Sequence, residues 1–324
     1  MEITNKKVAQ HPSRYVWDFW YSWDCQQEIF HVLYLNADRS LVASDQHHFA
    51  SELGYAVTKD FVEIDWIDDH AFTARPESWD NTSIWSGDLI AVQGGYLLFY
   101  TSRDKVRDDG LTQSIGAAFT TDFRNWTHLE TIKIDADPRF YETCGVKGDD
   151  TIHAWRDPFL FRIGNTIYML VAAKVAKAPL GRKGAVGLLR CEDATFSCWE
   201  ALPPITAPEW YSEMEVPQLY RDCEGLLQLV YSTQSKYDHA PATMGQGGLQ
   251  ALAVSDELQL TATAPKVLLP HTEGLYACRI VPELGGDIVG FDANHGGIRR
   301  AFRATGWTAV ERDFSDRDIG LPET

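Results

Sequence analysis

The chain has 324 residues, a formal net charge of −17 at pH 7 and an isoelectric point near 4.9. This negative charge would repel a phosphate backbone, and no compact stripe of lysine and arginine offsets it, so we predict no nucleic-acid partner. No run of about eighteen apolar residues is present, which argues against a membrane partner. The first fifteen residues lack the apolar segment of a secretory signal, and we therefore expect a cytoplasmic protein.

The six cysteines and ten histidines show no pattern that would hold a metal ion. There is no CxxC pair, and the His47–His48 pair has no third ligand at a useful spacing. The cysteines are therefore expected to be reduced thiols, and we predict neither a metal nor any other cofactor.

Short apolar and aromatic runs bounded by turn residues recur along the chain, which is the pattern typical of β-strands. In chain order the runs cover residues 29–35, 53–58, 95–102, 114–120, 166–174, 185–191, 226–233, 249–255 and 287–292. No long helical period competes with them. The sequence therefore predicts an all-β protein.

The predicted strands belong to an internal repeat, in which an outer strand ends in a turn such as TKDF, TTDFRNW or CEDATFSCW. Comparable points of the repeat, 58 to 70 residues apart, are Asp18, Gly87, Asp157, Glu215 and Tyr276. Each interval suits a four-stranded blade with long loops. We predict that residues 1–324 form a single five-bladed β-propeller domain, with blades beginning near residues 17, 85, 155, 213 and 275. A β-sandwich is the alternative, but its strands would be more evenly spaced.

Charged residues stand where the third repeat should become apolar. In WRDPF, Arg156 and Asp157 come directly before Pro158 and the apolar run FLF. An isolated ion pair of this kind would most simply cap a blade, but acidic residues occupy comparable points in the first and fourth units. In a propeller the first strand of each blade begins near one mouth of the channel, so we expect these residues to converge there.

The motifs at these points resemble those of glycoside hydrolase families 32 and 68, whose catalytic domains are five-bladed propellers acting on fructosyl bonds. WRDPF matches the Arg-Asp-Pro motif of that group, and EMEVPQLY resembles its Glu-Cys-Pro motif with Val216 in place of cysteine. YVWDFWYSWD places Asp18 ahead of the strand FHVLY, and IWSGDL resembles a Trp-Ser-Gly-Ser motif. The similarity runs from about Trp17 to about Phe291. A chain ending at Thr324 leaves no room for the C-terminal β-sandwich of family 32, which suggests a divergent single-domain branch.

The resemblance implies three catalytic roles, with Asp18 as nucleophile, Asp157 as transition-state stabiliser and Glu215 as acid/base. The Asn-Asp-Pro-Asn-Gly segment that surrounds the nucleophile in the family is absent, so Asp24 competes with Asp18 for that role. Glu213 would share a strand face with Glu215, but Pro217 selects Glu215 as the motif residue. Four further residues are expected to bind the sugar: Trp17, Trp20, Trp85 and Arg156.

The sequence thus predicts a retaining glycoside hydrolase, or a transferring enzyme, that acts on fructosyl bonds of small saccharides by double displacement. Two alternatives stay open. One is an inverting glycosidase of the family 43 type, acting on arabinosides or xylosides. The other is a non-catalytic propeller that binds sugar or protein, which would be favoured if Asp18 pointed away from the channel. Taken alone, Asp18 could also cap a turn, and Trp85 without its motif could be a packing residue.

Overall fold

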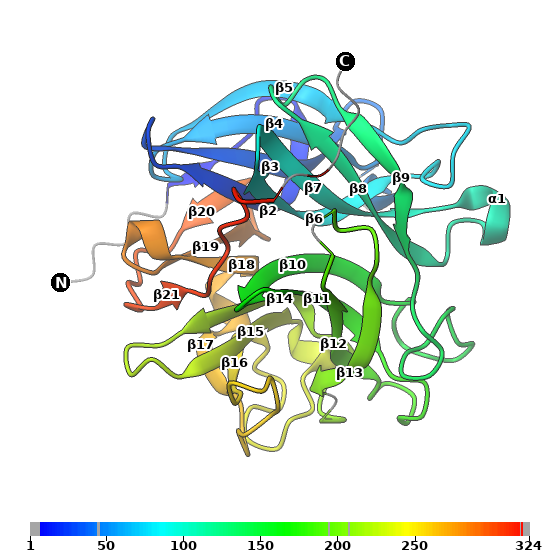
Figure 1. The fold of residues 1–324 in the computed structure, drawn as a ribbon. Coiled ribbons are helices and arrows are strands. Elements are labelled where there is room, and N and C mark those ends of the chain that lie inside the picture. Colours follow the sequence, from blue (N-terminus) through cyan, green and yellow to red (C-terminus); the bar gives the residue numbers. More distant parts are fainter. Residues whose placement is uncertain (1–6, 44–45, 194, 207, 318, 320–324) are drawn as a thin grey trace. The chain divides into compact units, whose positions relative to one another are not determined.

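The computed structural model describes residues 7–43, 46–193, 195–206, 208–317 and 319 (Figure 1). In this part of the chain the secondary structure is almost entirely β. The helices found there are a single-turn α-helix, α1 (Lys105–Asp108), and four short 3-10 helices, η1 (His47–Phe49), η2 (Ser235–Tyr237), η3 (His271–Glu273) and η4 (Pro282–Leu284). None of these described helices is long and apolar enough to cross a membrane.

The strands form five antiparallel sheets, in two compact units of the chain. Unit 1 comprises Met1–Ala71 and Gln218–Ala309, and unit 2 comprises Phe72–Pro217 and Val310–Thr324. One boundary between the units therefore falls within a strand, β14 (Glu215–Arg221).

Unit 2 holds two sheets of four strands, each with the strands in chain order. The first sheet consists of β6 (Ile84–Val92), β7 (Gly95–Arg103), β8 (Gln113–Thr120) and β9 (Thr127–Ile134). The second consists of β10 (Trp155–Ile163), β11 (Thr166–Lys174), β12 (Gly184–Cys191) and β13 (Glu200–Thr206).

Unit 1 contains most of the other three sheets. The first consists of β2 (Arg14–Asp24), β3 (Ile29–Asp38), β4 (Glu52–Thr58) and β5 (Ile64–Phe72). The second runs in the order β17 (Lys266–Leu269), β16 (Gly248–Ala253), β15 (Leu227–Thr233), β14 and β21 (Thr308–Ala309). The third runs in the order β1 (Val8–Ala9), β20 (Ile298–Arg300), β19 (Asp287–Asp292) and β18 (Leu275–Val281). The N-terminal strand β1 thus completes the last sheet of the chain, in antiparallel register with β20.

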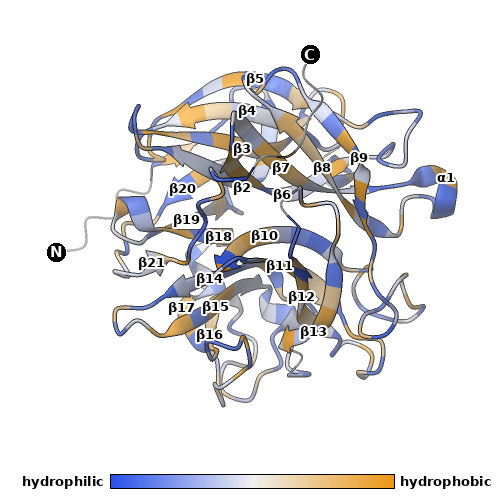
Figure 2. Ribbon diagram, viewed as in Figure 1, coloured by the Kyte–Doolittle hydropathy of each residue, from blue (hydrophilic) through white to orange (hydrophobic). Residues whose placement is uncertain are grey.

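The five sheets correspond to the five predicted repeats. Their first strands, β2, β6, β10, β14 and β18, begin within three residues of the expected blade starts. The middle strands are buried on both faces, as in β8 and β11, whereas the fourth strand of each sheet is partly exposed. Figure 2 shows hydrophilic residues along β9, an example of such an outer strand.

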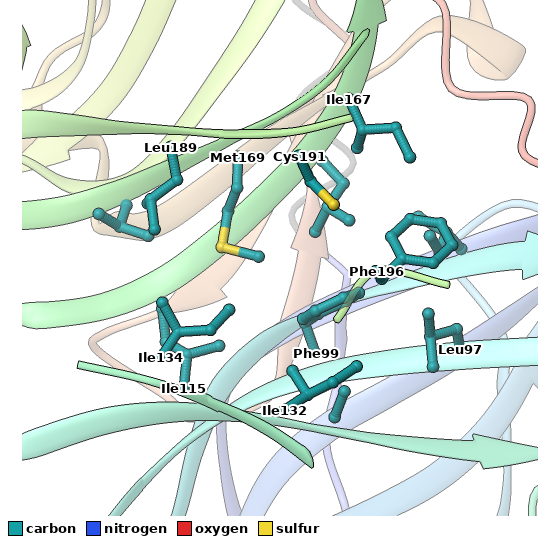
Figure 3. Packing of buried hydrophobic residues seen from close by; sticks show 14 of the residues in the cluster. Leu97, Phe99, Ile115, Ile132, Ile134, Ile167, Met169, Leu189, Cys191 and Phe196 are labelled. Carbon is teal, nitrogen blue, oxygen red and sulfur yellow. The ribbon is translucent and has the colours of Figure 1, made fainter. Parts of the chain in front are cut away.

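The core of unit 2 lies between its two sheets. Leu97 and Phe99 of β7 and Ile115 of β8 are buried in one cluster with Met169 of β11 and Leu189 of β12. Figure 3 shows these side chains pointing toward one another across the space between the sheets. Because each sheet buries one face against its neighbour, the apolar surface removed from water holds the two sheets together.

A C-terminal segment and a buried carboxylate also join these sheets. Phe314 is buried and forms a parallel bridge with Val92 at the end of β6. Asp88 of β6 accepts the backbone N–H of Leu160 in β10 (2.7 Å) and a hydrogen bond from Arg312 (2.6 Å). Since Asp88 is fully buried, these bonds satisfy its charge and fix β10 beside β6.

Candidate active site

Four of the first strands, β2, β6, β10 and β18, share a backbone irregularity near the points that the sequence singled out. In each of these sheets the first strand has one residue more than the second strand over a short stretch. The extra residue lies between Val16 and Phe19 in β2, Trp85 and Gly87 in β6, Arg156 and Phe159 in β10, and Tyr276 and Arg279 in β18. Such β-bulges bend a strand and re-aim its side chains, and they are frequent beside active sites. Asp18 and Asp157 both lie within these bulges.

Positive backbone φ angles accompany the bulges. Asp157 has a φ of 58°, and Ala277 in β18 has a φ of 47°. Val216, directly after Glu215, has a φ of 48°. A residue with a Cβ is strained in this conformation, and a β-branched residue such as valine more so. The chain therefore holds these positions by bonds to neighbouring strands.

Arg156 is the centre of the site in unit 2. Its side chain is buried, and its Nη2 donates to Glu213 Oε1 (2.8 Å) and to Glu215 Oε1 (3.0 Å). Its Nε lies 3.8 Å from Asp157 Oδ2, and its Nη1 donates to the backbone oxygen of His153 (3.3 Å). Burial opposes the charge of Arg156, but the three carboxylates raise its pKa well above the ordinary value. Arg156 is thus a fixed cation in a buried cluster of acids.

Asp157 links three strands. Its Oδ2 accepts the backbone N–H of Val216 (3.0 Å), and it also accepts a hydrogen bond from the side chain of Ser86 in β6. Its own N–H donates to Thr101 Oγ1 in β7 (3.3 Å). Burial raises the pKa of Asp157, while Arg156 opposes this shift. The bond to Val216 joins the Arg-Asp-Pro and Glu-Val-Pro motifs directly.

The predicted acid/base, Glu215, is the most accessible of the three carboxylates around Arg156. Its side chain is 18% exposed, against 8% for Glu213 and 4% for Asp157. It is therefore the carboxyl of this cluster that solvent reaches most easily.

Glu213 is the residue of this cluster that sequence reasoning passed over. The motif selects Glu215 and gives Glu213 no role, but the side chain of Glu213 is buried against Arg156. Burial raises the pKa of Glu213 to about 7, with Arg156 opposing this and the charge of Glu215 adding to it. The two-residue spacing from Glu215 was the available signal, but it does not reveal that a buried arginine contacts both.

Asp18 lies in unit 1, half-buried in the bulge of β2. Arg279 of β18 donates from Nε to the backbone oxygen of Phe19 (2.7 Å), which joins the two first strands of this unit. Burial raises the pKa of the Cys278 thiol to about 12, and the negative charge of Asp18 adds to this shift although Arg299 opposes it. The Asp18 carboxylate is therefore near Cys278, in the bulge of β18.

Asp24, the competing nucleophile, is the last residue of β2, at the opposite end from the bulge. Its Oδ1 accepts the backbone N–H groups of Gln26 (2.8 Å) and Gln27 (3.0 Å). These bonds lower the pKa of Asp24, the bond to Gln27 most of all. Asp24 therefore closes the turn between β2 and β3.

The predicted sugar-binding tryptophans differ in exposure. Trp20 has no exposed surface and Trp17 is only 4% exposed, with its ring edge-on to His47 at 4.6 Å between centroids. Trp85, at the start of β6, is partly exposed, and the guanidinium of Arg103 lies 4.4 Å from its ring centroid. Of the three, Trp85 has the most surface available to a ligand, while Trp17 and Trp20 contribute mainly packing.

The structure thus brings four predicted residues into unit 2, namely Arg156, Asp157, Glu215 and Trp85, and places Asp18, Trp17 and Trp20 in unit 1. The described residues contain no group of three or more His, Cys, Asp or Glu side chains that could hold a metal ion. The absence of a cofactor requirement stays a prediction.

A cavity of about 310 Å³ opens beside the end of β11 in unit 2. Its lining is mixed, with apolar side chains and three charged ones: Pro138, Arg139, Phe140, Val175, Ala176, Lys177, Ala178, Pro204 and Glu209. None of the predicted catalytic residues lines it. The carboxylate cluster around Arg156 therefore identifies the candidate site, and this cavity is a separate feature.

Comparison with known proteins adds a family and a fold. Residues 25–239, more than half of the chain, match the model of the glycosyl hydrolases family 32 N-terminal domain. A search of curated proteins found no match to the sequence.

Several solved structures share the fold. A levansucrase from Gluconacetobacter diazotrophicus is 17% identical, with a TM-score of 0.64 over 97% of this chain and 86% of that one. A β-fructofuranosidase from Microbacterium saccharophilum K-1 is 18% identical, with a TM-score of 0.62 over 89% and 69%. An inulosucrase from Halalkalicoccus jeotgali, bound to kestose, is 16% identical, with a TM-score of 0.61 over 100% and 97%. At these identities the likeness shows the fold alone, and the predicted all-β, five-bladed propeller is confirmed.

Proposed function

The chain belongs to glycosyl hydrolase family 32, as its motifs predicted, and on this premise we propose that it is a retaining enzyme that hydrolyses or transfers fructosyl groups of small saccharides. The supporting observation is the buried cluster around Arg156, in which the Arg-Asp-Pro and Glu-Val-Pro motifs are bonded to each other. An isolated structural ion pair would need only one acid, whereas Arg156 is bonded to two and lies close to a third.

The proposed chemistry is a double displacement through an oxocarbenium-like transition state. Asp18 attacks the anomeric carbon and forms a covalent fructosyl intermediate, while Glu215 protonates the leaving oxygen. Glu215 then removes a proton from water, or from the hydroxyl of a second sugar, which attacks the intermediate. Asp157 accepts hydrogen bonds from fructosyl hydroxyls, and Arg156 keeps Asp157 and Glu215 in place.

Local geometry favours Asp18 over Asp24 as the nucleophile. Asp18 lies in a bulge that corresponds to the one holding Asp157. Asp24 lies at the far end of the same strand, and its carboxylate accepts two backbone N–H groups of the following turn. Replacing Asp18 by Asn should therefore abolish turnover, and the matched variant Asp24→Asn should retain it.

We propose small saccharides as substrates because one fold relative is bound to kestose and the predicted cytoplasmic location would exclude long external polymers. The proposal includes that location and independence from metals. Cell fractionation and assays with a chelator test both points. Protein found outside the cell, or activity lost with a chelator and restored by a divalent ion, would contradict them.

The deciding experiment combines product stereochemistry with the variants Asp18→Asn, Glu215→Gln and Asp157→Asn. Wild-type protein is incubated with sucrose and with kestose, and the anomer released first is identified by NMR. Retention supports double displacement, whereas inversion would favour a family 43-type mechanism. The absence of any reaction on fructosides, with binding of sugar retained, would favour a non-catalytic propeller.

The Glu215→Gln variant separates proton donation from binding. It should be severely impaired on sucrose, whose leaving group needs a proton, and much less impaired on fructosyl fluoride, whose leaving group does not. Asp157→Asn should lower kcat more than it raises KM on both substrates, because its hydrogen bonds strengthen in the transition state.

A further inference from the structure

One amino group of Arg156 serves two carboxylates. Nη2 carries two hydrogens, and its bonds to Glu213 (2.8 Å) and Glu215 (3.0 Å) account for both. Asp157 is approached by Nε instead, at 3.8 Å. Because both glutamates depend on the same nitrogen, any change at Glu213 changes what Arg156 offers to Glu215.

The segment that carries Glu213 is held rigidly. Tyr211 is fully buried and its backbone oxygen accepts the N–H of Gly184, at the start of β12 (2.9 Å). A Cβ on Gly184 would fall 2.8 Å from the backbone nitrogen of Glu213, so only glycine allows this approach. Ser212 adds a bond to Asp150 Oδ2 (2.9 Å). The position of Glu213 is therefore set by its surroundings and not by Arg156 alone.

The charged groups that act on Glu213 come from three strands: Arg156 in β10, Lys174 at the end of β11 and Glu215 in β14. Lys174 is already paired with Asp149 (3.0 Å), and both side chains are buried. Arg156 is therefore the cation that is bonded to Glu213, and Glu215 is the acid that shares it.

A second buried pair lies beside this group. Lys183, the residue before β12, is bonded to Glu142 (2.6 Å), so its charge is also matched locally. Both nearby lysines are thus paired with other acids, whereas Arg156 is bonded to both glutamates.

We propose that Glu213 is a positioning residue for the fructosyl-transfer reaction proposed above: by binding Arg156 Nη2 it fixes the guanidinium and determines how much of its positive charge acts on Glu215. This inference rests on the proposed function, which it deepens by naming a residue that controls the acid/base. Glu213 does not need to touch the substrate.

The consequence is a shared titration. Two carboxylates on one guanidinium take up and release protons as a pair, and not independently. When Glu213 is ionised, it draws on the charge of Arg156 and places a second negative charge beside Glu215. When Glu213 is neutral, Glu215 faces the charge of Arg156 without that opposing charge. Because burial raises the pKa of Glu213 to about 7, this exchange occurs near neutral pH.

The test is the pH dependence of kcat/KM in the variant Glu213→Gln, which keeps an oxygen for Arg156 but has no charge. On sucrose, the alkaline limb of the profile should move to lower pH by about one unit or more, because Glu215 then faces Arg156 without the opposing negative charge of Glu213. On fructosyl fluoride the limb should stay where it is, because that leaving group needs no proton. A role in packing alone would change both substrates equally.

Two further variants complete the series. Glu213→Asp keeps the charge and should restore the wild-type alkaline limb on sucrose, at a lower kcat because the shorter side chain holds Arg156 less well. Glu213→Ala removes the bond altogether and should lower kcat about tenfold or more on both substrates. Superimposable profiles of wild type and Glu213→Gln on sucrose would overturn the proposal.

A measurement that does not need activity separates this proposal from the proposed function. Carbon-13 NMR of the glutamate carboxyls in the intact protein should show the titration of Glu213 moving to lower pH in Glu215→Gln, because a like charge is removed. The titration of Glu215 should also move to lower pH in Glu213→Gln. If both titrations are unchanged, the coupling is absent and the proposal fails, even if the enzyme acts on fructosides. If they shift but no fructoside reacts, only the proposed function fails.

Discussion

The bulges of β10 and β18 share one backbone device but carry different side chains. Each adds one residue to the first strand and places a residue with positive φ there, Asp157 in one and Ala277 in the other. Each also donates a backbone N–H to a side-chain hydroxyl on a second strand, from Asp157 to Thr101 and from Cys278 to Ser232, both at 3.3 Å.

The side chains at the two bulges have little in common. The β10 bulge presents a buried arginine and its acids, whereas the β18 bulge presents an alanine and a buried thiol. The comparison teaches that the bulge belongs to the repeated architecture, and that chemistry is added to it by substitution at one or two positions. Substitutions at the two bulges can separate the contribution of the backbone from that of the side chains.

The largest effect is expected from the side chain at the charged bulge. Asp157→Asn should lower kcat about a thousandfold, because an uncharged amide stabilises an oxocarbenium-like state far less than a carboxylate does. The matched change at the other bulge, Ala277→Ser, should leave kcat within about twofold. Steady-state kinetics on sucrose measure both, and thermal denaturation checks that both variants fold. Equal losses at the two bulges would show that the reaction does not depend specifically on the charged side chain.

The second prediction concerns stability and pH. The pKa of Glu213 is about 7 in the folded protein against an ordinary value of 4.5, so between these values the folded state holds a proton that the unfolded chain has lost. This stabilisation is complete below about pH 4.5 and is lost as the pH rises through about 7, and it amounts to at most about 3 kcal/mol.

Glu213→Gln should lack this dependence. Urea unfolding at pH 5 and pH 8 gives the free energy of unfolding of wild type and variant at each pH. The change in this free energy between the two pH values should be smaller in the variant. The β18 bulge provides the contrast, because burial raises the pKa of Cys278 to about 12, far above this range. Identical pH dependence in wild type and Glu213→Gln would show that Glu213 does not titrate there.

The third prediction tests the hydroxyl groups that hold the bulges. Thr101→Val and Ser232→Ala each remove the acceptor of one backbone N–H, and each should lower the free energy of unfolding by about 1 kcal/mol. Only Thr101→Val should also lower kcat, several-fold, because Asp157 loses its support. Comparable kinetic losses in Ser232→Ala would mean that both bulges serve the reaction.

The smallest effect is expected from backbone strain. Ala277→Gly relieves a φ of 47°, but glycine also loses more entropy on folding, so stability should rise by about 0.5 kcal/mol or less. Chemical denaturation can resolve such a change. A clear destabilisation would indicate that the methyl group of this buried alanine matters more than the strain.

Much of the fold could be predicted from local pattern. All nine predicted runs are strands in the structure, and the run 166–174 coincides with β11. The outer strands β5, β9, β13 and β17 were not predicted as ranges because they are partly exposed and have no continuous apolar run. The first strands were located only through their motifs, since a bulge interrupts the two-residue alternation that reveals a strand.

The sequence by itself determined the five repeats, the all-β class and the two motifs bonded at Arg156, because strand alternation and motif spacing are local properties of the chain. Only the tertiary structure decided that β1 pairs with β20, that Asp24 closes a turn, and that Trp20 is buried. It also decided that Glu213 is buried against Arg156. Strand pairing and the burial of a charge depend on which distant residues lie alongside, and a carboxylate two positions from another looks the same in sequence whether it faces water or an arginine.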